Sequence, residues 1–137
     1  DISWDGMELI AQIAEIYAIQ GFETKILAAS IRNPLHIVKA AEAGADVCKV
    51  FPADVLGPMF FKAVRGPLPQ VRMMPTGGVD LNTAQKFLEA GACCLGIGSQ
   101  LVEPKAVAEK NFDRIRELAS KYVEIVKNFR NSTLKGK

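Results

Sequence analysis

The sequence predicts an α/β fold built from parallel βα units. Short apolar runs alternate with segments of helical periodicity, and they recur about every 20 to 25 residues, the length of one βα unit. These apolar runs are 24–31, 45–51, 71–75 and 93–97. In addition, Glu-Ala-Gly-Ala occurs at both 42–45 and 89–92, each time where a helix gives way to a strand. Strict alternation of helices and buried strands implies a parallel sheet.

Helices are expected before, between and after these strands. The first runs to Gln20 and ends at Gly21. Ser3 or Asp5 can cap its start, and Glu8 follows Asp5 at the spacing of a capping box. The other helices are expected at 35–43, 57–64, 83–89, 104–109 and 112–129. The last is amphipathic, with one stripe formed by Ile115, Leu118, Ala119, Tyr122, Ile125 and Val126.

Chain length limits the architecture. A closed (βα)8 barrel needs eight units and about 250 residues, or at least about 200, whereas this chain has 137. We therefore expect a single domain, 1–137, that forms half of a TIM barrel with four strands. Two arrangements remain open. Two half-barrels can pair as a homodimer, which removes the exposed sheet edges, or the four strands can form an open, doubly wound, flavodoxin-like sheet.

Composition and charge exclude several classes of partner. The net charge of +2 gives no nucleic-acid signal, and no apolar run reaches the ~20 residues of a membrane span. Cys48, Cys93 and Cys94 lie in apolar runs without metal-ligand spacing, and the chain has one His. We interpret them as reduced, buried thiols of a cytoplasmic protein that needs no metal or cofactor.

Lys49 is the candidate catalytic residue. It lies inside the apolar run 45–51, close to the carboxyl end of a strand, where parallel sheets and barrels keep their ligands. A dry environment disfavours the ammonium form, and a neutral amine is the nucleophile that forms Schiff bases with carbonyl substrates. The alternative is an edge-strand lysine that extends its charged end to water.

Glycine turns after the third and fourth strands suggest an anion site. The turns are 76–78 (Thr-Gly-Gly) and 96–99 (Gly-Ile-Gly-Ser). Glycine lets backbone N–H groups approach a phosphate closely, and the start of a following helix would add its dipole. Barrels commonly bind phosphate after their last two strands. Ser30 and Arg32 end the first strand at the same edge and either contact an anion or lie in solvent.

From Val47 to about Tyr122 the chain resembles the carboxyl-terminal half of 2-keto-3-deoxy-6-phosphogluconate (KDPG/KHG) aldolase. The motifs that carry the resemblance are Lys49-Val50-Phe51-Pro52-Ala53, Gly66-Pro67-Leu68-Pro69-Gln70-Val71-Arg72, Met74-Pro75-Thr76-Gly77-Gly78-Val79 and Gly96-Ile97-Gly98-Ser99. The resemblance implies that Lys49 forms a Schiff base with pyruvate. It also implies that the substrate phosphate, or a sulfate ion, is held by Gly77, Gly78, Gly98 and Ser99, and that Phe51 and Thr76 line the pocket.

The first 46 residues resemble the late part of a small transaldolase or fructose-6-phosphate aldolase. The motifs are 1–7, 21–24 and 27–32, and the last implies phosphate contacts from Ser30 and Arg32. Two families joined near 44–47 suggest an engineered or recombined chimera of segments 1–46 and 47–130. The aldolase family also uses an early-strand Glu as proton shuttle, which this chain lacks. An active class I aldolase and an inactive scaffold that retains phosphate binding therefore both remain open.

Overall fold

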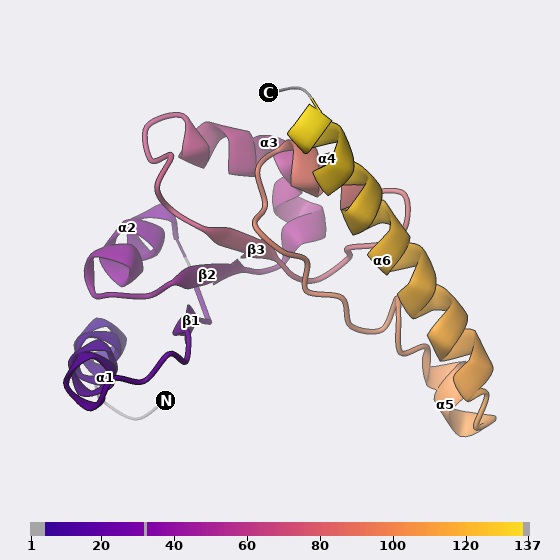
Figure 1. Ribbon diagram of the computed structural model, residues 1–137, viewed down its shortest axis with the longest axis horizontal. Helices are drawn as coiled ribbons and strands as arrows, with labels where there is room; N and C mark the ends of the chain where they lie inside the picture. The colour runs from indigo at the N-terminus through magenta and orange to yellow at the C-terminus, as the bar shows by residue number, and fades with distance from the viewer. Residues whose placement is uncertain (1–4, 32, 136–137) are drawn as a thin grey trace.

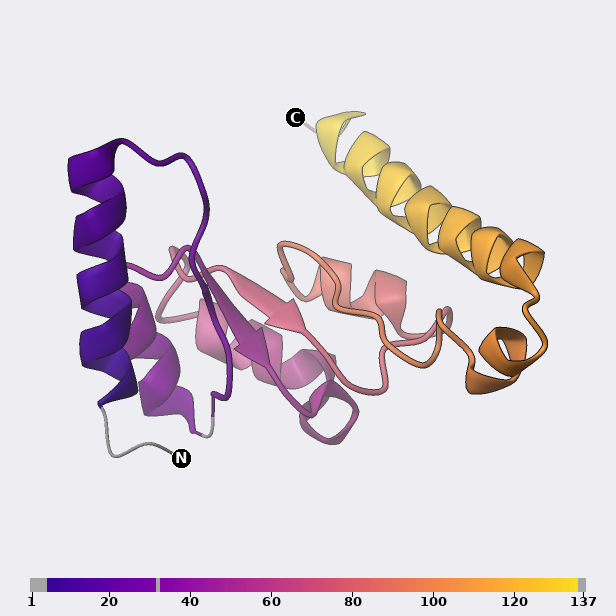
Figure 2. The same cartoon turned by 90° about the horizontal axis from the view of Figure 1, so that it is seen from below.

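The computed structural model describes residues 5–31 and 33–135 (Figure 1). Its elements are α1 (Gly6–Gln20), β1 (Leu27–Ala28), α2 (Pro34–Glu42), β2 (Val47–Val50), α3 (Ala53–Arg65), β3 (Met73–Pro75), α4 (Ala84–Glu89), α5 (Pro104–Ala108) and α6 (Phe112–Lys135). Both ribbon views place α1 and α6 at opposite ends of the molecule, with the sheet between them (Figures 1 and 2). No helix in the described ranges is long and apolar enough to cross a bilayer.

The three strands form one parallel sheet in the order β1-β2-β3. Leu27 of β1 is in register with Val47 of β2, and Lys49 of β2 is in register with Met74 of β3. Doubly wound sheets reverse their strand order at a switch point, whereas this order follows the sequence. The α/β fold of parallel βα units is confirmed, and its strand order is that of a barrel segment.

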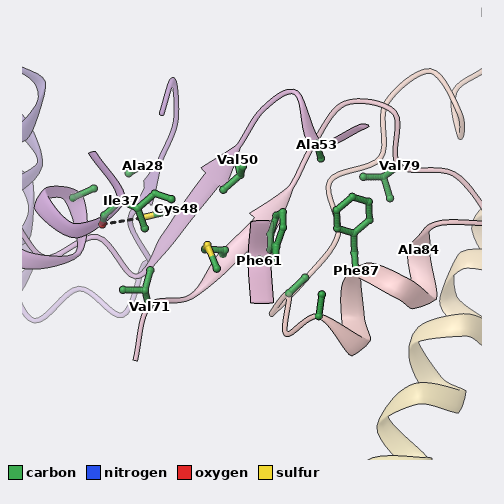
Figure 3. Packing of buried hydrophobic residues seen from close by; sticks show 14 of the residues in the cluster. Ala28, Ile37, Cys48, Val50, Ala53, Phe61, Val71, Val79, Ala84 and Phe87 are labelled. Carbon is green, nitrogen blue, oxygen red and sulfur yellow. Dashed lines mark hydrogen bonds between the residues drawn. The ribbon is translucent and has the colours of Figure 1, made fainter. Parts of the chain in front are cut away.

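The sheet is buried on one face. Cys48, Val50 and Met73 are at most 1% exposed, and their side chains meet Ile37 of α2 and Phe61 of α3 (Figure 3). Because successive side chains of a strand point to opposite faces, the face opposite Cys48 and Val50 contains Leu27, Val47, Lys49 and Met74. Leu27 is 47% exposed there, and the other three are half-buried. The described helices therefore cover the sheet unequally.

Two phenylalanines anchor α3 and α4 to the buried face. Phe61 and Phe87 are 0% and 1% exposed, and their rings meet edge to face with centroids 5.3 Å apart. This geometry adds to the free energy gained by burying each ring. The predicted stripe of α6 is also confirmed, because Leu118 and Tyr122 are buried and the remaining four residues of the stripe are partly covered.

The fourth predicted strand, 93–97, is largely absent. Cys93 and Cys94 lie in a bend, and only a parallel bridge between Thr76 and Gly96 remains. The segment still follows β3, since the Cys93 N–H donates to the Met73 carbonyl at 3.0 Å. With strand neighbours on one side only, its apolar residues do not impose a regular extended conformation.

Other boundaries differ for local reasons. The predicted strand 24–31 is reduced to the two residues of β1. Helix α3 begins at Ala53, four residues before the predicted start at 57, and is kinked at Gly57, where φ is 68° and ψ is 170°. Asp5 caps α1 by accepting a hydrogen bond from the Met7 N–H at 2.9 Å, as one of the two predicted caps. The other, Ser3, lies outside the described residues.

Asp46 joins β1 to β2. Its carboxylate accepts a hydrogen bond from the Ile26 N–H at 2.8 Å and lies 3.3 Å from the Lys25 ammonium. The Ile26 N–H is the main reason that the pKa of Asp46 lies below its ordinary value of 3.8, and Lys25 lowers it further. A carboxyl group with a lowered pKa stabilises the fold above its ordinary pKa, and this contribution is lost as the pH falls through the lowered value.

Replacing Phe61 with Ala should destabilise the fold strongly. The change removes a fully buried ring and its contact with Phe87, so we expect a loss of about 3–5 kcal/mol in the free energy of unfolding. Urea denaturation measures this loss. Val55→Ala, at a position 78% exposed, is the matched control and should change stability by less than about 0.5 kcal/mol. Equal effects would contradict the assigned core.

Asp46→Asn should reduce the acid sensitivity of folding. Between pH 7 and pH 3 the wild type should lose more stability than Asp46→Asn, because the variant lacks the carboxyl group at position 46, whose pKa is lowered in the folded state. Urea midpoints across this range measure the difference. Lys25→Ala should retain most of the wild-type pH dependence, since exposed ion pairs contribute little. Parallel profiles for the wild type and Asp46→Asn would contradict the assignment.

Candidate functional site

Lys49 is the next-to-last residue of β2 and lies on the less covered face of the sheet. Its side chain is half-buried, whereas its neighbours Cys48 and Val50 are buried under the helices on the other face. Met74, its register partner, lies on the same face as Lys49. The amine is thus carried by a rigid strand near the carboxyl end of the sheet.

Two backbone hydrogen bonds join the segment after β2 to the turn after β3. The Ala53 N–H donates to the Thr76 carbonyl at 2.9 Å, and the Asp54 N–H donates to the Gly77 carbonyl at 3.1 Å. Gly77 has a φ of 88°, and a Cβ atom there would lie 2.8 Å from the Phe51 ring. Only glycine fits this position. The structure therefore brings Phe51 beside the Thr-Gly-Gly turn.

Thr76 contributes a buried hydroxyl to this region. Its N–H donates to the Val50 carbonyl at 2.9 Å, which continues the β2–β3 pairing. Its Oγ1 has no hydrogen-bond partner among the described residues. Thr76 follows Met74 by two positions, so its side chain shares the face of Lys49. A buried hydroxyl without a partner marks a place where a ligand or water is expected.

The second glycine turn lies beside the first but has no helix directly after it. The Gly96 N–H donates to the Pro75 carbonyl at 2.9 Å. Gly98 and Ser99 are exposed, and the N–H groups of Leu101 and Val102 donate to the Gly98 carbonyl. The helix predicted at 104–109 is present as α5, Pro104–Ala108, but it begins five residues after Ser99, so no helix start lies at this turn.

Ser30 lies at the carboxyl end of β1 with a φ of 57° and is exposed. It lines a groove of about 600 Å³ together with Phe51, Pro52 and Phe60, so the structure brings it near the β2 end of the site. It also borders a second hollow, of about 440 Å³, between α1 and α2. Arg32, its predicted companion, lies outside the described residues.

Sequence reasoning missed two residues of this region, Met74 and Asp54. The sequence does contain a signal for Met74, because it lies two residues before Thr76 on the same strand and therefore shares its face. Asp54 directly follows the motif 49–53 in the sequence, and only the fold shows its position. A Cβ atom on Gly78 would lie 2.7 Å from Asp54 Oδ2. A carboxylate therefore lies against one glycine of the proposed phosphate turn.

Curated relatives of two kinds match parts of this chain. A 2-dehydro-3-deoxy-phosphogluconate aldolase of Haemophilus influenzae is 35% identical over 98 residues, which are 71% of this chain and 46% of that protein. A probable transaldolase of Hydrogenobaculum is 50% identical over 60 residues, 44% of this chain and 27% of the relative. The chain thus spans less than half the length of these curated relatives.

Solved structures share the fold. The structure described as "Native KDPGal structure" has a TM-score of 0.72 at 23% identity, over 93% of this chain and 57% of that one. A thiamine phosphate pyrophosphorylase from Pyrococcus furiosus has a TM-score of 0.65 at 18% identity, over 88% of this chain and 55% of that one. The sequence model described as KDPG and KHG aldolase matches residues 9–118. Since this match spans most of the chain, the protein belongs to the KDPG and KHG aldolase family.

Proposed function

We propose that the protein is a class I aldolase that cleaves or forms a carbon–carbon bond in a phosphorylated 2-keto acid, with pyruvate and an aldehyde phosphate as the other partners. One observation carries the proposal: Lys49 lies on the less covered face of the sheet, near its carboxyl end, with the unpartnered Thr76 hydroxyl on the same face. Family membership supports an aldolase-type function in general.

The proposed chemistry uses Lys49 as nucleophile. Its amine adds to the keto carbon and water leaves, which gives an imine that withdraws electrons from the bond to be broken. The Thr76 hydroxyl is available to hydrogen-bond the bound keto acid. Gly77, Gly78, Gly98 and Ser99, with Ser30 and Arg32, are proposed to hold the phosphate. General acid–base help is worth roughly 10²–10⁴ in rate, so the absence of the family's early-strand Glu should make turnover slow.

The proposal is tested by trapping the imine. Incubation with pyruvate and sodium borohydride should convert Lys49 to a secondary amine, which intact mass measures and peptide mapping places in the segment containing Lys49. Lys49→Gln should lose the modification. Lys86→Gln, at an exposed position on α4, should retain it. The proposal would be overturned if Lys49→Gln were still modified. It would also be overturned if this protein stayed unmodified under conditions in which a full-length aldolase of the family is modified.

A second candidate function is phosphate binding without catalysis, as expected for a chimeric scaffold. The observation that favours it is the match of the chain to relatives of two kinds, the aldolase of Haemophilus influenzae and the probable transaldolase of Hydrogenobaculum, together with the missing Glu. The chimeric origin and a cytoplasmic location remain predictions. The two functions differ in the trapping experiment, because a scaffold binds phosphate but forms no imine.

Asp54→Asn should tighten phosphate binding in either case. The Asp54 carboxylate lies against Gly78, where it repels an anion held by the turn, and the repulsion of two charges about 4 Å apart in water is about 1 kcal/mol. Removing it should lower the Kd for inorganic phosphate roughly fivefold, as measured by titration calorimetry. Asp113→Asn, on exposed α6, is the control. An unchanged Kd would contradict a phosphate site at this turn.

We also propose that a second copy of the chain covers the face of the sheet that carries Lys49. Leu27 is 47% exposed there, beside the half-buried Val47 and Met74. An apolar sheet face normally packs against another layer. A second copy offers the same strand order and would place two Lys49 residues inside one closed barrel.

A further inference from the structure

The bend at Cys93 and Cys94 brings two thiols together. In a regular strand, adjacent side chains would point to opposite faces. Here the two sulfur atoms lie 3.6 Å apart, and neither cysteine is in a disulfide. Both side chains line the same cleft, which lies between the 92–97 segment and α6. The departure from the predicted strand therefore creates a vicinal dithiol that opens to one space.

The cleft has a volume of about 240 Å³ and is mostly apolar, with Leu95, Val126 and Phe129 among its walls. Tyr122 of α6 also lines it and is 5% exposed. The Tyr122 hydroxyl is buried and has no hydrogen-bond partner among the described residues. The cleft is therefore a small, mostly apolar space into which the two thiols open.

The separation of the two sulfur atoms suits one bent, two-sulfur centre. If a single soft atom bonds both sulfurs at about 2.3 Å, the 3.6 Å separation requires an angle of about 103° at that atom. A linear two-coordinate ion would need the sulfurs about 4.6 Å apart. The separation thus excludes a linear centre and fits a bent one. A tetrahedral metal needs further protein ligands, and the described residues contain no group of three His, Cys, Asp or Glu side chains that could hold one, so a pyramidal, trivalent centre fits best.

The protonation state of the Cys94 thiol also favours a trivalent, hydroxylated element. Burial, reinforced by neighbouring Cys93, raises the pKa of Cys94 to about 11, so this thiol stays protonated at neutral pH. Thiol–disulfide exchange needs a thiolate. Condensation with a hydroxylated element proceeds from the thiol itself, because each S–H proton leaves with a hydroxyl group as water.

We propose that the cleft binds trivalent arsenic as arsenous acid, through Cys93 and Cys94. Two As–O bonds break and two As–S bonds form, two molecules of water leave, and arsenic stays trivalent, so no oxidant or reductant is needed. The product keeps one hydroxyl group on arsenic. The site is separate from the proposed imine chemistry of Lys49.

Mass spectrometry of the reduced, full chain tests the site. With arsenite alone, native spectra should show one adduct per chain, with a mass equal to arsenous acid less two waters. Phenylarsine oxide should also give one adduct per chain, with a mass equal to phenylarsine oxide less one water. After tryptic digestion the phenylarsine adduct should lie on Phe87–Lys105, which contains both thiols, and not on Ala40–Lys49, which contains Cys48. Absence of an adduct, or an adduct on the Cys48 peptide, would overturn the proposal.

Variants give a second, independent readout. Cys93→Ser and Cys94→Ser should each lose arsenite binding, whereas Cys48→Ala should retain it, because Cys48 is buried under α2 with its thiol 3.7 Å from the Ile37 carbonyl. Circular dichroism checks that each variant folds. If a variant does not fold, peptide mapping of the wild-type adduct locates the binding site instead. Retention of full binding by either serine variant would contradict the site.

Discussion

The unequal burial of the sheet is the constraint on which the rest of the structure depends. Burying an apolar side chain is worth roughly 1.5–3 kcal/mol, and the helices supply this burial on the face of Cys48, Val50 and Met73. On the opposite face, Leu27 is exposed and Lys49 is half-buried. A lysine can be held on a rigid strand there without being enclosed by the core.

Much of the fold could be predicted from the sequence because its signals are local. Asp5 caps α1, and Asn33 caps α2 by accepting from the His36 N–H at 3.0 Å. Helical periodicity likewise located α6 and its buried stripe. The fourth strand could not be predicted correctly, because an apolar run such as 93–97 is extended only where neighbouring strands impose it. Because a strand would place adjacent side chains on opposite faces, the proximity of Cys93 and Cys94 could not be predicted either.

The candidate site was predictable in part. Lys49 and the Thr-Gly-Gly turn were nominated from motifs, and the structure brings Phe51 against Gly77 by a contact that only glycine permits. The helix expected at 104–109 is present as α5, but a turn closed on the Gly98 carbonyl separates it from Ser99, so its start does not face this turn. Asp54 could not be assigned because its position against Gly78 depends on how two loops from different strands meet.

The most direct test of the account is the mass of the chain in solution, measured by light scattering after size exclusion. If a second copy covers the face that carries Lys49, the wild type should be a dimer of about twice the 14.9 kDa chain mass. Leu27→Glu, on that face, should then be monomeric. Met59→Glu, at a position of α3 that is 71% exposed, should remain dimeric. A wild-type monomer at micromolar concentration, or a Leu27→Glu dimer, would contradict the account.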